Sequence, residues 1–149
     1  ETGLRGNRRL KSLKSFTCFD SRGVSNEEFL AIAGALNKNE GLVDVDLNYN
    51  FPMSDETWDV LCDSLKTHPT LKMLKLKPIH QRLDRRSLPP AVLVYQIQAL
   101  VDVLKVNKRI HTIDLHDCYS EHELYRETII PYLEKNRVRA IQRTNPMAY

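Results

Sequence analysis

One apolar pattern recurs along this 149-residue chain and constrains its fold more than any other feature. The pattern reads L-x-x-L-x-L, with substitutions, and in three copies a cysteine or asparagine follows after two further residues. Copies begin at Leu10, Leu42, Leu71 and Ile110, and a degenerate fifth copy begins at Val138. Their starts are 32, 29, 39 and 28 residues apart. Alternating apolar residues predict a short strand in each copy, and the repetition predicts a stack of similar units.

The segments between the copies have the spacing of amphipathic helices. Apolar residues recur at i, i+3, i+4 and i+7 in three of them: Phe29, Ile32, Ala33 and Leu36; Trp58, Leu61, Cys62 and Leu65; Ile97, Leu100, Val101 and Leu104. This spacing places one apolar stripe along each helix. Ser25 with Glu28 predicts a capping box, and Ser54 predicts an N-cap. Pro131 predicts a bend or an early end in the last helix.

A linking phrase, L-x-x-N-x-x-L, joins each helix to the next strand. It begins at Leu4, Leu36, Leu104 and Leu133, and at Leu65 with histidine in place of asparagine. The strand pattern and this phrase together resemble leucine-rich-repeat proteins of the ribonuclease-inhibitor-like subfamily, from Leu4 to about Thr144. The resemblance implies an α/β fold, a leucine-rich-repeat solenoid (a horseshoe segment) of about four to five repeats. Its parallel β-sheet would line the concave face and its α-helices the convex face.

Residues 1–149 are expected to form a single leucine-rich-repeat domain. Strand alternation predicts that one residue of each copy faces the core: Leu13, Val45, Leu74, Ile113 and Ile141. Leu47, Leu76 and Leu115, two residues further on, are expected to point the same way. The pattern is weak at both ends, and the chain starts within a linking phrase. Because solenoids need capping repeats, these features favour a piece of a longer array.

The expected concave face carries the candidate partner-binding residues. On the strands these are Lys14, Asp44, Asp46, Asn48, Met73, Lys75, Lys77, Asp114 and His116, with Phe16 and Tyr49 as aromatic anchors. One row across the five strands reads Lys14, Asp46, Lys75, Asp114 and Gln142. This row is either a ladder of charges that stabilises the sheet or a mixed-charge docking face. Phe16 either contacts a partner or packs under the start of the chain.

An insertion from Pro78 to Pro90 accounts for the long third interval. It is expected to stand on the rim of the horseshoe. It contains three arginines, Arg82, Arg85 and Arg86, and a single acid, Asp84. The segment is either a solvated loop braced by prolines or a basic contact for an acidic partner.

Composition argues against several classes of protein. The net charge of +3 is mild, and acids and bases are mixed along the chain, which disfavours nucleic-acid binding. No apolar run reaches the roughly 18 residues that a membrane span needs. Three cysteines cannot all pair with one another, and they lack the close spacing of a metal site. These features favour a reducing, cytoplasmic setting.

The sequence lacks the motifs of common catalytic sites. It contains no phosphate-cradling glycine loop, no GxSxG elbow and no HExxH. Cys118 falls on the cysteine or asparagine position of the repeat pattern, which predicts a buried structural thiol instead of a zinc ligand beside His111 and His116. Carboxylates on an open sheet face are too little desolvated to serve as general acids or bases. We therefore expect no enzymatic activity, no cofactor and no metal.

These observations favour a non-catalytic scaffold that binds another protein on its concave face or rim. One alternative is a regulator of a small GTPase resembling the Ran GTPase-activating protein, although no motif of that class can be matched residue by residue. Another is a structural or sensor segment of a larger NOD-like receptor-type protein. Self-association through exposed end repeats also stays open.

Overall fold

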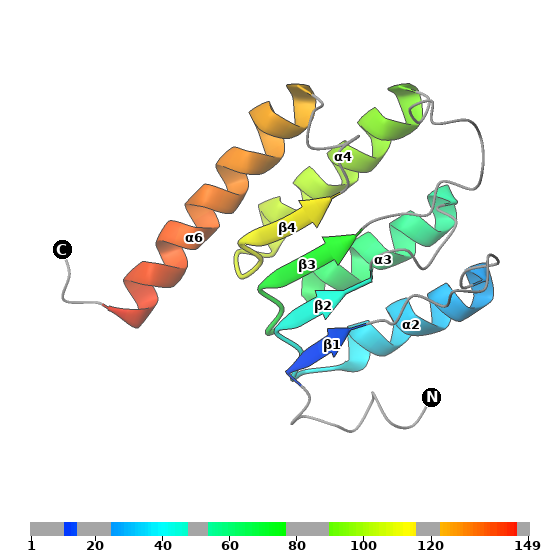
Figure 1. The fold of residues 1–149 in the computed structure, drawn as a ribbon, viewed down its shortest axis with the longest axis horizontal. Helices are drawn as coiled ribbons and strands as arrows, with labels where there is room; N and C mark the ends of the chain where they lie inside the picture. The colour runs from blue at the N-terminus through cyan, green and yellow to red at the C-terminus, as the bar shows by residue number, and fades with distance from the viewer. Residues whose placement is uncertain (1–10, 15–24, 48–53, 77–89, 116–122, 146–149) are drawn as a thin grey trace.

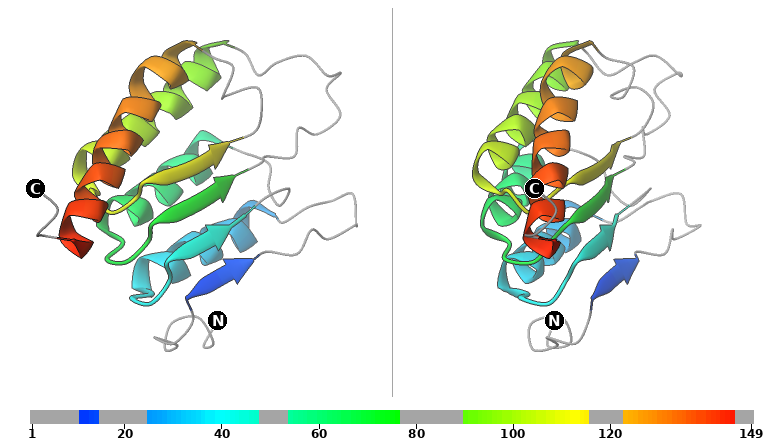
Figure 2. Two further views of the ribbon diagram at one scale, coloured as in Figure 1. Left: turned by 60° about the vertical axis from the view of Figure 1, so that its left-hand side comes forward. Right: turned by 90° about the vertical axis from the view of Figure 1, so that its left-hand side faces the viewer.

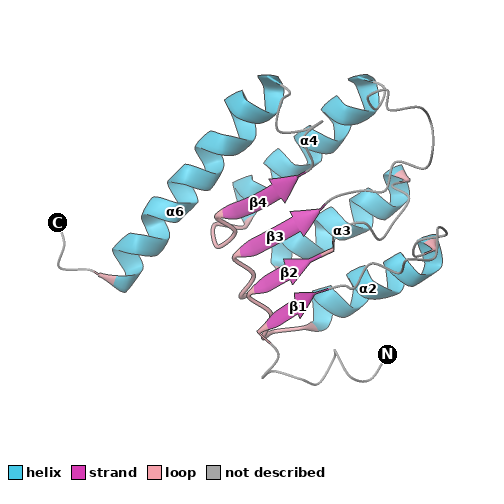
Figure 3. Cartoon of the chain, in the orientation of Figure 1, coloured by secondary structure: helices cyan, strands magenta, loops and turns pink. Residues whose placement is uncertain are grey.

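Short strands and longer helices alternate along the chain. The computed structural model describes residues 11–14, 25–47, 54–76, 90–115 and 123–145 (Figure 1). In order, its elements are β1 (Ser12–Lys14), α2 (Asn26–Lys38), β2 (Asp44–Asp46), α3 (Asp55–Thr67), β3 (Met73–Leu76), α4 (Pro90–Val106), β4 (Thr112–Leu115), η1 (Tyr125–Ile129) and α6 (Ile130–Thr144). A helix joins each strand to the next, as parallel neighbours require (Figure 3).

The four strands form one parallel sheet in the order β1-β2-β3-β4. Their pairing aligns Leu13 with Val45, Val45 with Leu74, and Leu74 with Ile113. For these four strands, this is the register that the alternating pattern predicts. A slip of one residue would turn each strand's apolar side chains to the opposite face of the sheet.

Helices α2, α3 and α4 lie side by side on one face of the sheet (Figure 2). The predicted capping box at the start of α2 is confirmed, since Ser25 Oγ accepts from the Glu28 N–H at 3.2 Å and the Glu28 carboxylate accepts from the Ser25 N–H at 2.8 Å. The predicted N-cap of α3 is confirmed as well, because Ser54 Oγ accepts from the Thr57 N–H. Both helices therefore begin where the sequence indicates.

The apolar core lies between the sheet and these helices. Two rows of strand residues are buried in it: Val45, Leu74 and Ile113, then Leu47, Leu76 and Leu115. The predicted helix stripes face these rows, with Ile32 only partly buried. Trp58, the bulkiest fully buried side chain, donates its indole N–H to the Gln96 carbonyl at 3.2 Å. This bond satisfies the one polar group that Trp58 takes into the core.

The prediction of a fifth strand from Val138 is wrong. The segment lies within α6, which continues directly from η1, a turn of π-helix. Ile141, expected in the core, is 52% exposed. The residues between Leu133 and Arg143 include strong helix formers and no glycine or proline. In contrast, Gly41 and Pro69 interrupt the chain before β2 and β3.

Pro131 does not end the last helix early. It lies in the first turn of α6, immediately after η1, and α6 continues to Thr144. The π-turn already departs from regular α-helical hydrogen bonding, so the lack of a backbone N–H at Pro131 is tolerated there.

The described residues therefore form a small α/β domain of four parallel strands that ends in a long helix (Figure 1). The expected leucine-rich-repeat solenoid of four to five repeats, a horseshoe segment, is wrong, because the last copy of the pattern turns into helix and does not extend the sheet. None of the helices in the described ranges combines the length and apolar character needed to cross a membrane.

Leu47→Ala is expected to lower the free energy of unfolding by about 2 to 5 kcal/mol, because it leaves a cavity beneath the sheet. Leu47 is 1% exposed. Chemical denaturation measures the change. Val106→Ala, at a position 62% exposed, is the control and should change stability by less than about 0.5 kcal/mol. An equally small change in Leu47→Ala would contradict the register.

Candidate functional site

The sheet face opposite the helices carries five of the predicted partner-binding residues. These are Asp44, Asp46, Met73, Lys75 and Asp114. Pairing places Asp44 beside Met73, Asp46 beside Lys75, and Lys75 beside Asp114. Asp114 is exposed and the other four are half-buried. The structure thus brings these five residues together on one surface.

The other predicted site residues add no geometry to this surface. The backbone of Lys14 pairs with that of Asp46, but the Lys14 side chain lies outside what the structure describes. Wholly outside the described residues are Phe16, Asn48, Tyr49, Lys77, Arg82, Arg85, Arg86 and His116. Their part in partner binding stays a prediction.

The charged row on this face crosses four strands, not five. Gln142, expected as its fifth member, lies on α6 and is exposed. Along the remaining row Asp46 stands between two lysine positions, Lys14 and Lys75. Two close ion pairs lie elsewhere, on helix surfaces: Lys66–Asp63 at 3.0 Å and Lys105–Asp102 at 2.9 Å. The sheet row is therefore an alternation of opposite charges along a partly solvated surface.

The described residues are poorly arranged for catalysis. Among them, no group of three histidine, cysteine or acidic side chains is placed to hold a metal ion. Burial raises the pKa of Cys62 to about 12, so this cysteine stays a thiol at neutral pH. Burial also lowers the pKa of His111, as do the nearby charges of Arg137 and Lys72.

A ladder of four buried polar side chains runs along the edge at which the strands begin. Its members, from the fourth position of each linking phrase, are Asn39, His68, Asn107 and Asn136. The first three use one side-chain atom to accept from backbone N–H groups of the following turn. Asn39 Oδ1 accepts from Gly41 and Leu42 at 2.8 Å each. His68 Nδ1 accepts from Leu71 at 3.1 Å, and Asn107 Oδ1 from Arg109 at 2.9 Å.

Two side-chain amides of this ladder also join a turn to the preceding one. Asn107 Nδ2 donates to the carbonyls of Leu65 at 2.7 Å and His68 at 3.1 Å. Asn136 Nδ2 donates to the carbonyls of Asn107 at 3.3 Å and Ile110 at 2.9 Å. Buried backbone groups require such partners, so the ladder is what allows the turns to pack against one another.

His68 fills only half of this role. Because its Nδ1 accepts from backbone N–H groups, the proton of the neutral ring lies on Nε2. Nε2 is buried and has no hydrogen-bond partner among the described residues. Burial lowers the pKa of His68, which keeps the ring neutral. The His68 ring thus makes no bond to the preceding turn, and Thr70 supplies a link instead, since its Oγ1 donates to the carbonyls of Glu40 at 3.2 Å and Leu42 at 2.7 Å.

Helix α6 exposes an apolar surface outside the core. Only Leu133 and Asn136 are buried along its length. Val138 and Ile141 are 49% and 52% exposed, and their spacing of three residues places them on one face of the helix. Exposed Arg137 lies four residues before Ile141 on that face. We call Arg137, Val138 and Ile141 the α6 surface.

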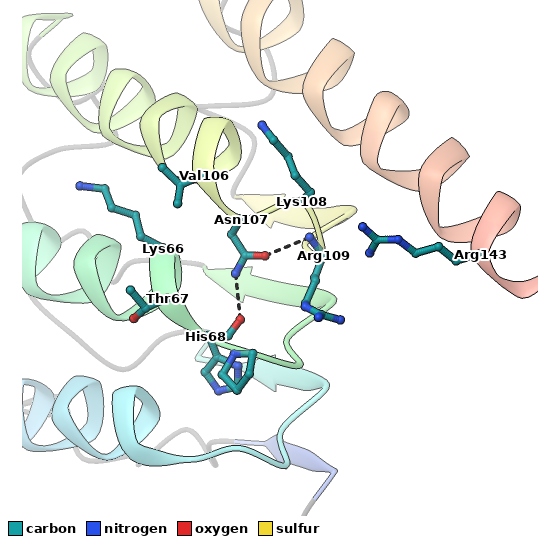
Figure 4. Close-up of a pocket in the computed structure, with 9 residues that line it drawn as sticks. Lys66, Thr67, His68, Val106, Asn107, Lys108, Arg109 and Arg143 are labelled. Atoms are coloured by element: carbon teal, nitrogen blue, oxygen red, sulfur yellow. Dashed lines mark hydrogen bonds between the residues drawn. The ribbon is translucent and has the colours of Figure 1, made fainter.

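A basic hollow of about 290 Å³ lies where α3, α4 and α6 end (Figure 4). Six of the residues that line it are Lys66, His68, Asn107, Lys108, Arg109 and Arg143. It therefore adjoins the polar ladder and combines residues from three helices and the turn before β4.

The fold resembles leiomodin and tropomodulin domains. Actin-binding site 2 of leiomodin-1 matches 95% of this chain and 72% of its own, with a TM-score of 0.67 and 19% sequence identity. A tropomodulin C-terminal domain from Caenorhabditis elegans matches over 95% of this chain and 93% of its own, with a TM-score of 0.55 and 18% identity. No protein-family model and no curated protein matches the sequence.

These similarities correct what the repeated pattern implied. The assignment to the ribonuclease-inhibitor-like subfamily of leucine-rich-repeat proteins is wrong, because the matching folds are leiomodin and tropomodulin domains. The same finding overturns the predicted scaffold that binds through a concave face or rim. It overturns both alternatives as well, since neither match is a Ran-type GTPase activator or a NOD-like receptor.

Three features of these surfaces were not predicted. The role of the linking-phrase asparagines had a signal in the sequence, since a polar residue recurs four positions into each phrase. The α6 surface had a weaker signal in the sequence, because Val138 and Ile141 also fit helical spacing. The basic hollow had no signal in the sequence, because Lys66 and Arg143 are distant along the chain and line one hollow only in the fold.

Asp46→Lys is expected to destabilise the domain by about 0.5 to 1 kcal/mol at low salt, because it sets a third lysine between Lys14 and Lys75. Added salt should reduce the effect by screening. Asp46→Asn, which removes the charge at constant shape, should fall between this variant and the wild type. Denaturant titration measures all three proteins, and equal stabilities at low salt would contradict the alternating row.

His68→Asn is expected to raise the free energy of unfolding by about 0.5 to 1.5 kcal/mol at pH 7. Asparagine restores an amide donor for the preceding turn while its oxygen keeps the bond to Leu71. The measurement is denaturation at pH 7. A destabilised variant would show that the ladder does not use an amide at this position.

The same variant is expected to lose less stability in acid. The lowered pKa of His68 means that, below the ordinary value of 6.5, the unfolded chain binds a proton that the folded chain does not. Wild-type stability is therefore full above pH 6.5 and falls as the pH drops further. The pKa of His111 is lowered too, but this residue is present in both proteins and does not affect the comparison. Identical slopes between pH 7 and pH 5 would exclude His68 as a contributor.

Proposed function

We propose that this chain is an actin-binding domain. The observation that carries the proposal is the match of 95% of the chain, at a TM-score of 0.67, to actin-binding site 2 of leiomodin-1. Because one fold serves many functions, the proposal also needs a surface on this chain that suits a protein partner.

The α6 surface meets that need. Val138 and Ile141 together form an apolar contact on a helix that has little contact with the core. Apolar anchors beside an arginine are typical of the residues that contribute most to protein–protein binding. We therefore assign the actin contact to the second half of α6, in place of the open sheet face.

The proposed activity is binding without chemistry. The buried thiol of Cys62, which stays protonated at neutral pH, supports a non-catalytic role for the described residues. An actin-binding role also makes the partner a protein and sets the site of action in the cytoplasm.

Co-sedimentation with actin filaments and fluorescence titration of labelled monomeric actin test the proposal. The wild-type chain is expected to bind at least one form of actin. Val138→Asp/Ile141→Asp should weaken that binding at least about tenfold, because it places charge in a desolvated apolar contact. Both substitutions are at exposed positions, so the melting temperature should be nearly unchanged.

Val94→Asp is the matched control. Val94 is 43% exposed on α4, so the change of residue is the same on another helix. Its actin binding should equal that of the wild type. Absence of wild-type binding to both forms of actin would overturn the proposed function. Equal loss in the double variant and in the control would overturn the assignment to α6.

A further inference from the structure

The basic hollow has a lining with an excess of positive charge. Lys66, Lys108, Arg109 and Arg143 contribute to it, and no aspartate or glutamate does. They come from α3, from the turn before β4 and from the end of α6, so the fold brings together charges that are distant in sequence. Figure 4 shows Arg143 extending from α6 towards the turn that holds Lys108 and Arg109.

Two of these four cations have partners within the domain. Lys66 Nζ lies 3.0 Å from the Asp63 carboxylate. Lys108 Nζ donates to the Leu104 carbonyl at 2.9 Å and lies over the Tyr132 ring, 5.8 Å from its centre. No described residue pairs with the guanidinium group of Arg109 or Arg143. These two arginines therefore keep their fork of donors for a ligand.

The C-terminal ends of α3 and α4 disfavour an anion in the hollow, because their last carbonyls carry partial negative charge and point towards it. The carbonyls nearest the hollow are already hydrogen-bonded. Asn107 Nδ2 donates to those of Leu65 and His68, and Lys108 donates to that of Leu104. These hydrogen bonds offset part of that unfavourable effect.

Crowding of positive charge is visible at Lys108. Its pKa is lowered, first by burial and then by the charges of Arg139 and Lys135. A bound anion would offset this mutual repulsion. The apolar content of the lining is small, so charge and hydrogen bonding would supply most of the recognition.

We propose that the basic hollow is a binding site for a phosphate-bearing ligand, held chiefly by Arg109 and Arg143. A hollow of about 290 Å³ is at the lower end of the range for small-molecule sites, which suits a compact polar group such as a phosphorylated inositol ring. Arginine matches the geometry of phosphate with two parallel hydrogen bonds. The ring could be free in solution or the headgroup of a lipid. This site is separate from the α6 surface and does not depend on actin binding.

Calorimetric titration with inositol trisphosphate at low salt tests the site, without actin. The wild-type chain should bind, and its affinity should fall as salt is added. Arg109→Glu and Arg143→Glu should each weaken binding at least about tenfold, the effect of losing one charge-assisted contact. Melting temperatures close to that of the wild type would show that both variants remain folded.

Arg126→Glu is the matched control, because it makes the same change of charge at an exposed position of η1, the segment that precedes α6. Its affinity should stay within about twofold of the wild type. Equal weakening in all three variants would reduce the effect to net charge and overturn the proposal. Absence of wild-type binding both to inositol trisphosphate and to vesicles that contain phosphatidylinositol bisphosphate would overturn it as well.

A vesicle arm distinguishes the two sources of the ligand. Phosphatidylcholine vesicles are compared with and without phosphatidylinositol bisphosphate. Binding to the second kind alone, lost in Arg143→Glu, identifies a lipid headgroup. Binding of soluble inositol trisphosphate with no binding to either vesicle identifies a free ligand. Both results support the site, whereas binding to neither probe rejects it whatever the outcome of the actin assay.

Discussion

The burial of two rows of apolar side chains beneath very short strands is the constraint on which the rest of this structure depends. A strand of three or four residues makes too few hydrogen bonds to hold its own place, so packing against the helices must set its position. Val45, Leu74 and Ile113 form one row, and Leu47, Leu76 and Leu115 form the other. Once both rows face the helices, the opposite face of the sheet must carry the polar residues. The mixed-charge surface is a consequence of this packing.

The register, the helix starts and the helix stripes were predictable because each depends on local spacing. The last segment was not, because Val138 and Ile141 satisfy the spacing of a strand pattern and of a helix face alike. The chain before them lacks the interruption that Gly41 and Pro69 provide before β2 and β3, but the chain before β4 lacks it as well, so local sequence does not separate the two outcomes. The family inferred from the repeats was wrong for a related reason. Spacing reports how a strand packs on a helix, and different families share that packing.

The candidate surfaces were less predictable than the fold. Of the residues chosen from the sequence, the structure places Asp44, Asp46, Met73, Lys75 and Asp114 together, and most of the others lie outside its description. The basic hollow depends on where the end of α6 lies relative to α3 and α4, which only the fold shows. The resulting domain is electrically uneven. Acids and lysines alternate on the open sheet face, whereas the edge where the strands begin carries Arg109 and Arg143, whose guanidinium groups have no partner among the described residues. An approaching anionic molecule is therefore drawn towards that edge.

The polar ladder has a direction. Asn107 completes the turn that precedes it, and Asn136 completes the turn of Asn107 in the same way. These two turns are thus each completed by the residue that follows in the stack, and the last of them is completed from within α6. The last helix is therefore needed to satisfy the backbone of the turn that precedes it. Substitution of Asn136 would leave the carbonyls of Asn107 and Ile110 without their donor and would destabilise the stack from its C-terminal end. A comparable substitution in α2 would leave that last turn intact.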